Sequence, residues 1–351
     1  MQNISSVYRT NKGMPFRFEI QSPGRPHGRL GAGRKDEMMI NVRLSGVIPP
    51  LVTPVDAQGK FDAAAMRALL KRQIAAGVNG VLVLGSTGEF SQMDVAMRKD
   101  ILEQVVAEVG GRVPVLAGVG TPSTRETIAL ARHAKSVGVA AALVVNPYYT
   151  PLSETHLLAH YREIADGVDM PLFLYNYPGM TGQDVGPALV REVALTCPNF
   201  VGIKDSVEAM SHTQQILLDV KPERPDFMVF SGFDDHLLPN LILGGDGAIP
   251  GTANFAPEVT CGLYQAFLRR DYPSMFAAHR QIAALMAIYR VDTPVYGPIK
   301  EAIRMTGVSI PRDVLAPARE LDTKGRERVA AILKAALPDF AAGLALSASH
   351  V

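Results

Sequence analysis

The 351-residue chain contains no tryptophan, and its aromatic residues make up only 7% of the sequence. So few aromatic side chains leave little to stack against nucleic acid bases. The formal net charge is +1, which offers no basic surface for nucleic acid or for an anionic membrane. No apolar run is long enough to span a bilayer. We therefore expect neither nucleic acid nor a membrane as a partner.

Cysteine is also scarce, because the chain has only Cys197 and Cys261. Two cysteines at this spacing form neither a disulfide framework nor a metal-ligand set. They are expected to be buried free thiols in a reducing compartment, and we predict a cytoplasmic protein. His156 and His160 have metal-compatible helical spacing but no glutamate between them, so they are expected to be a surface pair.

Residues 1–44 differ from the rest of the chain. They are rich in glycine and arginine, show no apolar periodicity, and contain no acidic residue before Glu19. We expect a disordered N-terminal tail, or a true start at Met38 or Met39. A transit-type leader is the alternative, because such leaders are rich in arginine and poor in acids.

From residue 46 onward, short apolar runs alternate with helical segments. The runs expected to be strands lie at residues 47–53, 80–84, 113–117, 139–145, 171–174, 199–204, 227–230 and 248–249. Runs this continuous are typical of parallel strands that are buried on both faces. Eight strand–helix units in about 210 residues favour a (β/α)8 TIM barrel over an open doubly wound sheet.

The predicted barrel covers residues 45–257, and Pro49 and Pro50 interrupt its first strand. No Gly-x-Gly-x-x-Gly follows that strand, which argues against a dinucleotide-binding fold. After residue 257 the alternation stops and three or four helices follow, so residues 258–351 are predicted to be a C-terminal helical extension.

In a TIM barrel the active site lies at the C-terminal ends of the strands. The polar residues at those predicted ends are Thr53, Ser86, Thr87, Glu89, Tyr148, Tyr149, Tyr175, Asn176, Lys204, Asp205, Asp234 and Asp235. They contain no His and carboxylate cluster at metal spacing and no Ser-His-Asp arrangement. We therefore predict no metal site. Ser206 and Ile249, which adjoin two of these ends, are further candidate substrate contacts.

Lys204 ends the apolar run at residues 199–204, where polar residues begin. Apolar neighbours disfavour the ammonium form, so the pKa of such a lysine falls and a neutral amine becomes available to attack a carbonyl. The alternative is an ordinary solvated lysine just past a strand.

Gly85-Ser86-Thr87-Gly88 precedes a helix, and the N–H groups of such a glycine-flanked turn can bind a small carboxylate. A keto acid held there could present its ketone to Lys204, and Tyr175 could relay protons. The alternatives are an ordinary βα turn and a core tyrosine.

Four motifs in order carry a family resemblance: Gly85-Ser86-Thr87-Gly88-Glu89, Asn146-Pro147-Tyr148-Tyr149, Tyr175-Asn176-Tyr177-Pro178 and Gly202-Ile203-Lys204-Asp205. They resemble the dihydrodipicolinate synthase / N-acetylneuraminate lyase superfamily of pyruvate-dependent class I aldolases, over about residues 45–338. The resemblance implies that Lys204 forms a Schiff base with pyruvate and that Tyr175 relays protons. It also implies that Ser86 and Thr87 bind the carboxylate. Tyr149 resembles a tyrosine that enters a neighbouring subunit's site, which implies a homotetramer built from dimers.

Within the superfamily, the stretches 232–237, 244–249 and 254–257 look closest to bacterial 2-keto-3-deoxygluconate aldolases. Asp234 and Asp235 resemble acidic residues that would bind sugar hydroxyls; the alternative is helix capping. Dihydrodipicolinate synthases carry a carboxylate-binding arginine where this chain has Met180, and a thioether cannot replace a guanidinium.

The resemblance therefore implies reversible cleavage of a 2-keto-3-deoxy sugar acid to pyruvate and an aldehyde. Lys204 is the nucleophile, and Tyr175 takes the C4 hydroxyl proton with help from Thr87 and from a neighbour's Tyr149. No cofactor is expected beyond the imine on Lys204. Three alternatives stay open: a dihydrodipicolinate-type condensation, a 2-keto-3-deoxy acid dehydratase that uses the same lysine, and a non-catalytic keto-acid sensor.

Overall fold

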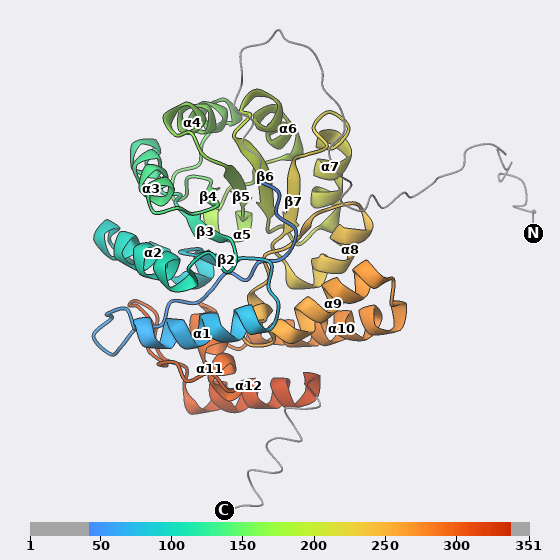
Figure 1. Cartoon of the computed structure of the whole chain (residues 1–351). Helices are drawn as coiled ribbons and strands as arrows, with labels where there is room; N and C mark the ends of the chain where they lie inside the picture. The colour runs from blue at the N-terminus through green and yellow to red at the C-terminus, as the bar shows by residue number, and fades with distance from the viewer. Residues whose placement is uncertain (1–41, 338–351) are drawn as a thin grey trace, which may run out of the picture. The chain divides into compact units, whose positions relative to one another are not determined.

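The computed structural model describes residues 42–337, and a barrel of parallel strands lies at its centre (Figure 1). The strands are β1 (Gly46–Val47), β2 (Val81–Val83), β3 (Val115–Gly118), β4 (Ala141–Val145), β5 (Leu172–Asn176), β6 (Phe200–Asp205), β7 (Met228–Ser231) and β8 (Gly247–Ala248). They follow the order β1-β8-β7-β6-β5-β4-β3-β2, and every pair is parallel. A parallel bridge between Pro50 and Leu82 joins the two ends of this order. The predicted (β/α)8 barrel is confirmed.

The first strand is shorter than its apolar run. Residues 47–53 were expected to be a strand, but β1 ends at Val47. Pro49 and Pro50 cannot donate backbone hydrogen bonds, and proline is therefore excluded from the interior of a ladder. The Pro49 carbonyl still accepts the N–H of Leu82 at 2.9 Å, so the segment contacts β2 without forming a regular strand.

Helices surround the strands in the ring that Figure 1 shows. The barrel helices are α1 (Ala63–Ala75), α2 (Val95–Val109), α3 (Thr124–Ser136), α4 (Glu154–Gly167), α6 (Pro187–Thr196), α7 (Met210–Val220) and α8 (Leu237–Ile242). Side chains of Asp62, Asp94, Ser123 and Ser153 accept backbone N–H groups at the starts of α1 to α4. These caps satisfy donors that have no partner within the helix.

Short elements lie in the loops that follow the strands. They are η1 (Ser86–Gly88) and η2 (Phe90–Gln92) after β2, α5 (Pro178–Thr181) after β5, η3 (Asp234–His236) after β7, and η4 (Gly251–Asn254) after β8. All of these loops leave the C-terminal ends of their strands, so they gather at one mouth of the barrel.

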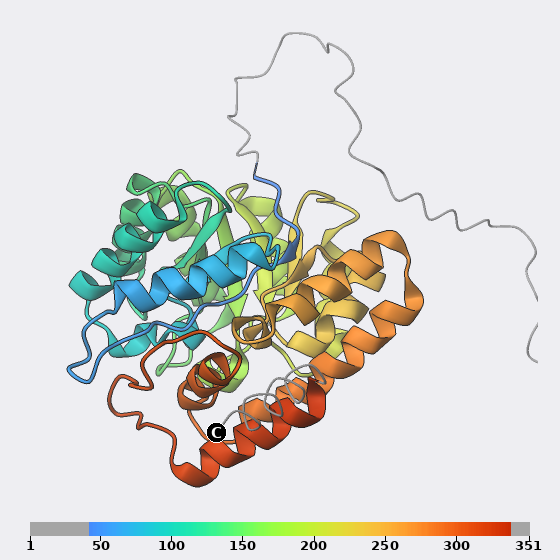
Figure 2. The ribbon, with the colours of Figure 1, turned by 60° about the horizontal axis from the view of Figure 1, so that its bottom comes forward.

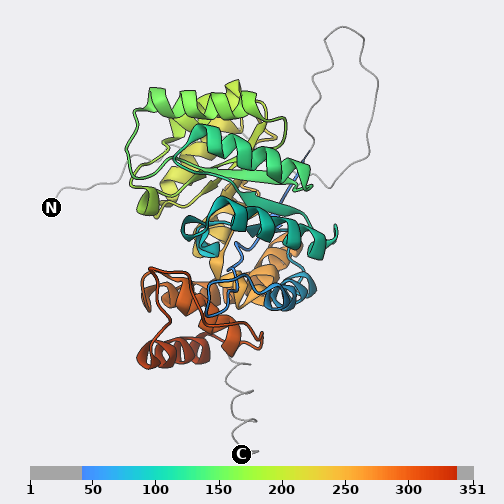
Figure 3. The same ribbon diagram turned by 90° about the vertical axis from the view of Figure 1, so that its left-hand side faces the viewer.

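The C-terminal helices lie beside the barrel (Figures 2 and 3), and the first of them follows β8 and packs on β1. They are α9 (Pro257–Arg269), α10 (Tyr272–Leu285), α11 (Tyr296–Met305) and α12 (Thr323–Ala336), with the short helix η5 (Met286–Arg290) after α10. Residues 1–41 of the predicted tail, and the end of the predicted extension, lie outside the described residues. The predicted boundaries therefore stay predictions.

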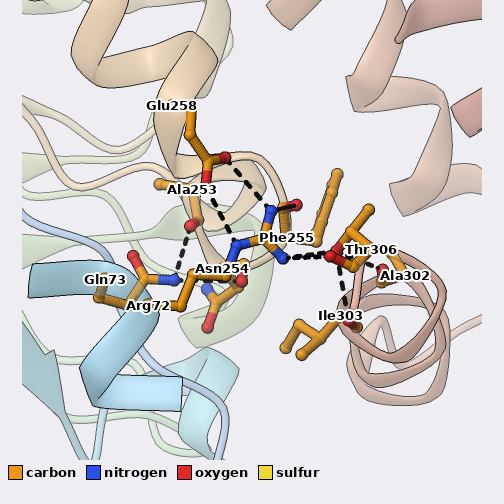
Figure 4. Close-up of polar contacts among 9 residues, drawn as sticks. All are labelled: Arg72, Gln73, Ala253, Asn254, Phe255, Glu258, Ala302, Ile303 and Thr306. Atoms are coloured by element: carbon orange, nitrogen blue, oxygen red, sulfur yellow. Dashed lines mark hydrogen bonds and ion pairs between the residues drawn. The ribbon is translucent and has the colours of Figure 1, made fainter. Parts of the chain in front are cut away.

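Arg72 of α1 fastens this helical group to the barrel (Figure 4). Its Nη1 donates to the carbonyl and the hydroxyl of Thr306, at 2.9 and 2.8 Å. Its Nη2 donates to the Phe255 carbonyl at 3.0 Å, and the guanidinium is ion-paired with Glu258 at 3.2 Å. One side chain thus joins α1, the start of α9 and the end of α11. Within residues 42–337, no helix has both the length and the apolarity to cross a membrane.

Candidate active site

Lys204 and Tyr175 are neighbours at the mouth of the barrel. They are paired in register on β6 and β5, and neighbours in register on parallel strands project to the same side of the sheet. The Lys204 Nζ lies 4.3 Å from the centroid of the Tyr175 ring. The strand pairing therefore brings together the two residues that the sequence predicted as nucleophile and proton relay.

Lys204 is buried, with 4% of its side chain exposed, and among the described residues no side chain forms a salt bridge with its amine. Burial lowers the pKa of Lys204 to about 7, and the negative charge of Asp234 opposes this shift. The desolvation penalty falls on the ammonium, whereas a nearby carboxylate or aromatic face favours it. A substantial fraction of the amine is therefore neutral near pH 7.

The Tyr175 hydroxyl lies in a small polar network. It is 3.2 Å from the Ser86 hydroxyl. Burial raises the pKa of Tyr175 to about 12, and the Ser86 and Ser206 side chains oppose the rise. Tyr175 is thus a neutral phenol that can pass protons through a neighbouring hydroxyl. We predicted that Thr87 assists Tyr175, but the structure brings Ser86 to the phenol instead.

The turn that carries Ser86 and Thr87 is held close to β3. Leu84, at the end of β2, has the positive φ of 57° that is uncommon outside glycine. Its carbonyl approaches Gly118 so closely that a Cβ there would lie 2.0 Å from the oxygen. Only glycine fits, so Gly118 allows the turn to sit over the mouth. A small, largely apolar cavity reaches Gly85 and Tyr175, but Lys204 does not line it.

The Asp234 carboxylate accepts three hydrogen bonds from other residues of the chain. Its Oδ1 accepts the N–H of Gly251 at 3.1 Å, and its Oδ2 accepts the N–H of Thr252 at 2.6 Å and the Tyr289 hydroxyl at 2.7 Å. Burial raises the pKa of this carboxyl, and these hydrogen bonds oppose the rise. Asp234 therefore caps η4, which matches the capping alternative more closely than the predicted contact with sugar hydroxyls.

The other predicted site residues differ in exposure. Asp235 is half-buried, and its Oδ1 has no hydrogen-bond partner among the described residues. Ile249 is buried and donates its N–H to the Ser231 carbonyl at 2.9 Å. Tyr149 is 96% exposed and has a positive φ of 78°. Asp235 therefore keeps a free acceptor, whereas the Tyr149 side chain is almost entirely exposed to solvent.

Sequence analysis missed an ionic network behind the two catalytic candidates. His212 of α7 lies between Asp205 and Asp184, with Nδ1 2.9 Å from an Asp205 oxygen and Nε2 3.3 Å from an Asp184 oxygen. Asn176 donates to both carboxylates, at 3.1 and 2.8 Å.

Burial would lower the pKa of His212, but the two carboxylates outweigh it and raise that pKa to about 10. Asp205 and Asn176 directly follow Lys204 and Tyr175, so an imidazolium ties the ends of β5 and β6 together. The sequence analysis included Asp205 and Asn176 among the polar residues at the predicted strand ends, but no local sequence pattern connects them to His212.

Within residues 42–337, no three His, Cys, Asp or Glu residues are grouped so that they could hold a metal ion. The expectation of a surface histidine pair was wrong for one member, because His160 is buried. Its Nδ1 lies 2.8 Å from the Thr124 hydroxyl, and burial lowers the pKa of His160 to about 4. Cys197 and Cys261 are free and buried, as predicted.

The comparisons with known proteins agree with this fold. Residues 43–336 match the model of the dihydrodipicolinate synthetase family. "Probable 2-dehydro-3-deoxy-D-pentonate aldolase YjhH" of Escherichia coli K12 is 41% identical over 293 residues, which cover 84% of this chain and 97% of that protein.

"Putative 2-dehydro-3-deoxy-D-gluconate aldolase YagE" of the same organism is 40% identical over 83% of this chain and 96% of its own length. The crystal structure of YagE in complex with pyruvate superimposes with a TM-score of 0.82 and covers 83% of this chain and 98% of that one. A 4-hydroxy-tetrahydrodipicolinate synthase of Methanoculleus marisnigri is 35% identical over 82% of this chain and 98% of its own length.

A (β/α)8 barrel with a buried lysine and a tyrosine at its mouth defines a class of barrel lyases. The chain belongs to the dihydrodipicolinate synthetase family. It is an enzyme of the aldolase type.

Proposed function

We propose that this aldolase reversibly cleaves a 2-keto-3-deoxy sugar acid to pyruvate and an aldehyde through a Schiff base on Lys204. The observation that carries the proposal is the buried Lys204 amine, which contacts the Tyr175 ring and forms no salt bridge with any described residue. Two relatives whose names refer to 2-dehydro-3-deoxy sugar acids, and the pyruvate bound to YagE, support this substrate class.

In the proposed reaction, the neutral Lys204 amine attacks the C2 ketone of the substrate. Loss of water from the carbinolamine gives an iminium, which can accept an electron pair. The Tyr175 phenol and the Ser86 hydroxyl, 3.2 Å apart, relay the protons of these steps.

Removal of the C4 hydroxyl proton then breaks the C3–C4 bond. Its electron pair moves into the iminium, which becomes the pyruvate enamine as the aldehyde leaves. Protonation at C3 and hydrolysis return pyruvate and the free Lys204 amine. The N–H groups and hydroxyls of the turn at Ser86 and Thr87 would hold the carboxylate throughout. The proposed reaction uses no metal or organic cofactor, so a chelator should leave the rate unchanged.

We also propose that the enzyme works as a homotetramer in which Tyr149 enters a neighbour's site. A tyrosine that is 96% exposed in a left-handed conformation is unusual, and such conformations persist where further contacts hold them. Light scattering of the purified protein tests the tetramer. A monomer that is fully active at assay concentration would contradict it.

Sodium borohydride with pyruvate tests the Schiff base. Reduction should fix a pyruvate-derived adduct on the peptide that contains Lys204, as judged by mass spectrometry. No adduct on Lys204 would refute the proposed chemistry. A panel of aldehydes with pyruvate, read by condensation rate, then defines the acceptor.

Product analysis separates the remaining alternatives. A dehydrated keto acid would indicate a dehydratase, and condensation with aspartate semialdehyde would indicate the dihydrodipicolinate-type reaction, whose name one relative carries. Pyruvate binding without turnover would indicate a sensor. Met180 on α5 is half exposed and has no charge to bind a second carboxylate, which favours a sugar-derived aldehyde.

A further inference from the structure

Glu89 and Lys300 form an ion pair in which neither side chain is exposed to solvent. The Glu89 Oε1 lies 2.6 Å from the Lys300 Nζ. The other Glu89 oxygen accepts the N–H of Leu315 at 2.7 Å, and the Lys300 amine donates to the Asp313 carbonyl at 2.7 Å. Lys300 belongs to α11, and residues 313–315 lie between α11 and α12. The pair therefore connects the C-terminal helices to the end of β2.

The glutamate of this pair directly follows Ser86, Thr87 and Gly88. Its backbone is left-handed, with φ 61° and ψ 26°, and its N–H donates to the Ser86 carbonyl at 3.2 Å. Non-glycine residues keep such a conformation where their surroundings over-determine it. The contacts of the Glu89 side chain supply that constraint, so the position of Lys300 bears directly on the shape of the turn.

The opposite side of the turn is held by the segment after β1. The Thr53 hydroxyl donates to the Gly88 carbonyl at 2.8 Å. A Cβ on Gly88 would lie 3.0 Å from the Leu51 carbonyl, so the turn approaches that segment too closely for a larger residue at this position. Buried ion pairs often add little net stability compared with apolar residues of similar volume, and in some proteins they are retained because they specify one conformation. The distinctive contribution of this pair is therefore the placement of the turn.

From this geometry we infer that Lys300 is a positioning residue for the substrate carboxylate. Through Glu89, it fixes the Ser86 and Thr87 donors that receive the carboxylate, and it makes the C-terminal helices a structural part of the active site. The inference deepens the proposed function and rests on it, because it takes the turn to be the carboxylate site.

The test compares three single variants with the wild-type enzyme. Lys300→Met removes the cation, and Glu89→Gln keeps an acceptor for Leu315 but removes the charge. Arg72→Met is the matched control, because Arg72 also anchors α11 to the barrel but contacts Thr306 at the far end of that helix (Figure 4). For each protein, calorimetry gives the pyruvate dissociation constant, borohydride trapping at saturating pyruvate gives the Lys204 adduct, and thermal melting monitors folding.

We expect Lys300→Met to weaken pyruvate binding by about tenfold or more, because small displacements of a positioning group have large effects. The adduct should still form at saturating pyruvate. Glu89→Gln should weaken binding in the same direction, and it serves as the test if Lys300→Met does not fold. Arg72→Met should leave the dissociation constant within about twofold of wild type, even if its melting temperature falls.

The outcomes separate this inference from the proposed function. Unchanged pyruvate affinity in a folded Lys300→Met or Glu89→Gln variant overturns the positioning role, as does an equal loss in Arg72→Met. A wild-type enzyme that binds pyruvate without forming the adduct refutes the Schiff base, yet weakened binding in Lys300→Met would still support positioning. A wild-type enzyme that binds no pyruvate overturns both.

Discussion

Within residues 42–337 two lysines are buried near the barrel mouth, and their surroundings are opposite. Lys204, 4% exposed, faces the Tyr175 ring, and Asp234 acts on it only as a nearby charge. Lys300 is completely buried, in contact with a carboxylate at 2.6 Å and a carbonyl at 2.7 Å. Burial lowers the pKa of both lysines, and Glu89 opposes that shift for Lys300.

The difference shows that burial alone does not make a lysine a nucleophile. The Lys300 amine lies 2.6 Å from a Glu89 oxygen and donates to the Asp313 carbonyl, so its position is fixed by these two partners. Lys204 lacks such partners among the described residues, so it can lose its proton and attack a carbonyl. We therefore expect Lys300, which is buried with a carboxylate partner, to act by its position, and Lys204, which is buried without one, to be the reactive amine.

The contrast between the two lysines would be contradicted most clearly if the enzyme stayed active without Lys204. Lys204→Met should lower kcat/KM by roughly 10⁴-fold or more, because no covalent intermediate can form. Steady-state assays with pyruvate and the best aldehyde of the panel measure the loss. Lys300→Met, the control, should keep a Lys204 adduct after borohydride reduction. A pyruvate adduct on Lys300 of the Lys204→Met protein would contradict the assignment of roles.

Stability should change in opposite directions for the two lysines. Lys300→Met strands a buried carboxylate and should lower the free energy of unfolding by about 3–5 kcal/mol. Lys204→Met removes a buried cation without stranding a paired partner and should raise it by about 1–4 kcal/mol at pH 7. Urea denaturation followed by circular dichroism measures both. Equal losses in the two variants would show that their surroundings do not differ in the way described.

The sequence predicted those features that depend on local patterns. Continuous apolar runs indicated the parallel strands, and the change from apolar to polar at Lys204 indicated the strand end and its amine. Tyr175 ends the preceding strand, so the barrel fold alone placed it beside Lys204. The runs predicted for β1 to β4 were longer than the strands, most of all for β1, which ends before the two prolines that were expected to interrupt it.

Features that depend on distant pairings could not be predicted in this way. Lys300 lies on an amphipathic helix and nothing beside it indicates Glu89 as its partner, since the pairing depends on where α11 packs. The same holds for His212 between Asp184 and Asp205, and for Asp234 beneath η4. Exposure of Tyr149 likewise became evident only in three dimensions.

Tyr175→Phe sharpens the comparison, because it keeps the ring beside Lys204 but removes the hydroxyl. General acid–base groups contribute typically 10²–10⁴-fold, so kcat should fall by about 10²-fold or more. The Lys204 adduct should still form with pyruvate, but more slowly, as followed by quenched-flow borohydride trapping. An unchanged kcat would remove Tyr175 from the relay and leave Ser86 or Ser206 as the proton donor. Tyr161→Phe, which alters a buried tyrosine on α4 outside the site, is the matched control.

The lowered pKa of Lys204 should also be visible in how the rate of adduct formation and the stability depend on pH, and these effects should be smaller. Because the pKa of Lys204 is about 7, the rate of adduct formation should fall about tenfold per unit below pH 7 and level off above it.

This pKa of Lys204 lies below the unfolded value of 10.5, so the unfolded state binds more protons between pH 7 and 10.5. Stability should therefore rise with pH across that window, and Lys204→Met should lose the rise. Trapping rates and urea midpoints from pH 6 to 9 measure both effects. A flat trapping rate would mean that the amine is held neutral throughout, and a rate that still rises about tenfold per unit up to pH 9 would mean that the amine is as charged as an ordinary surface lysine.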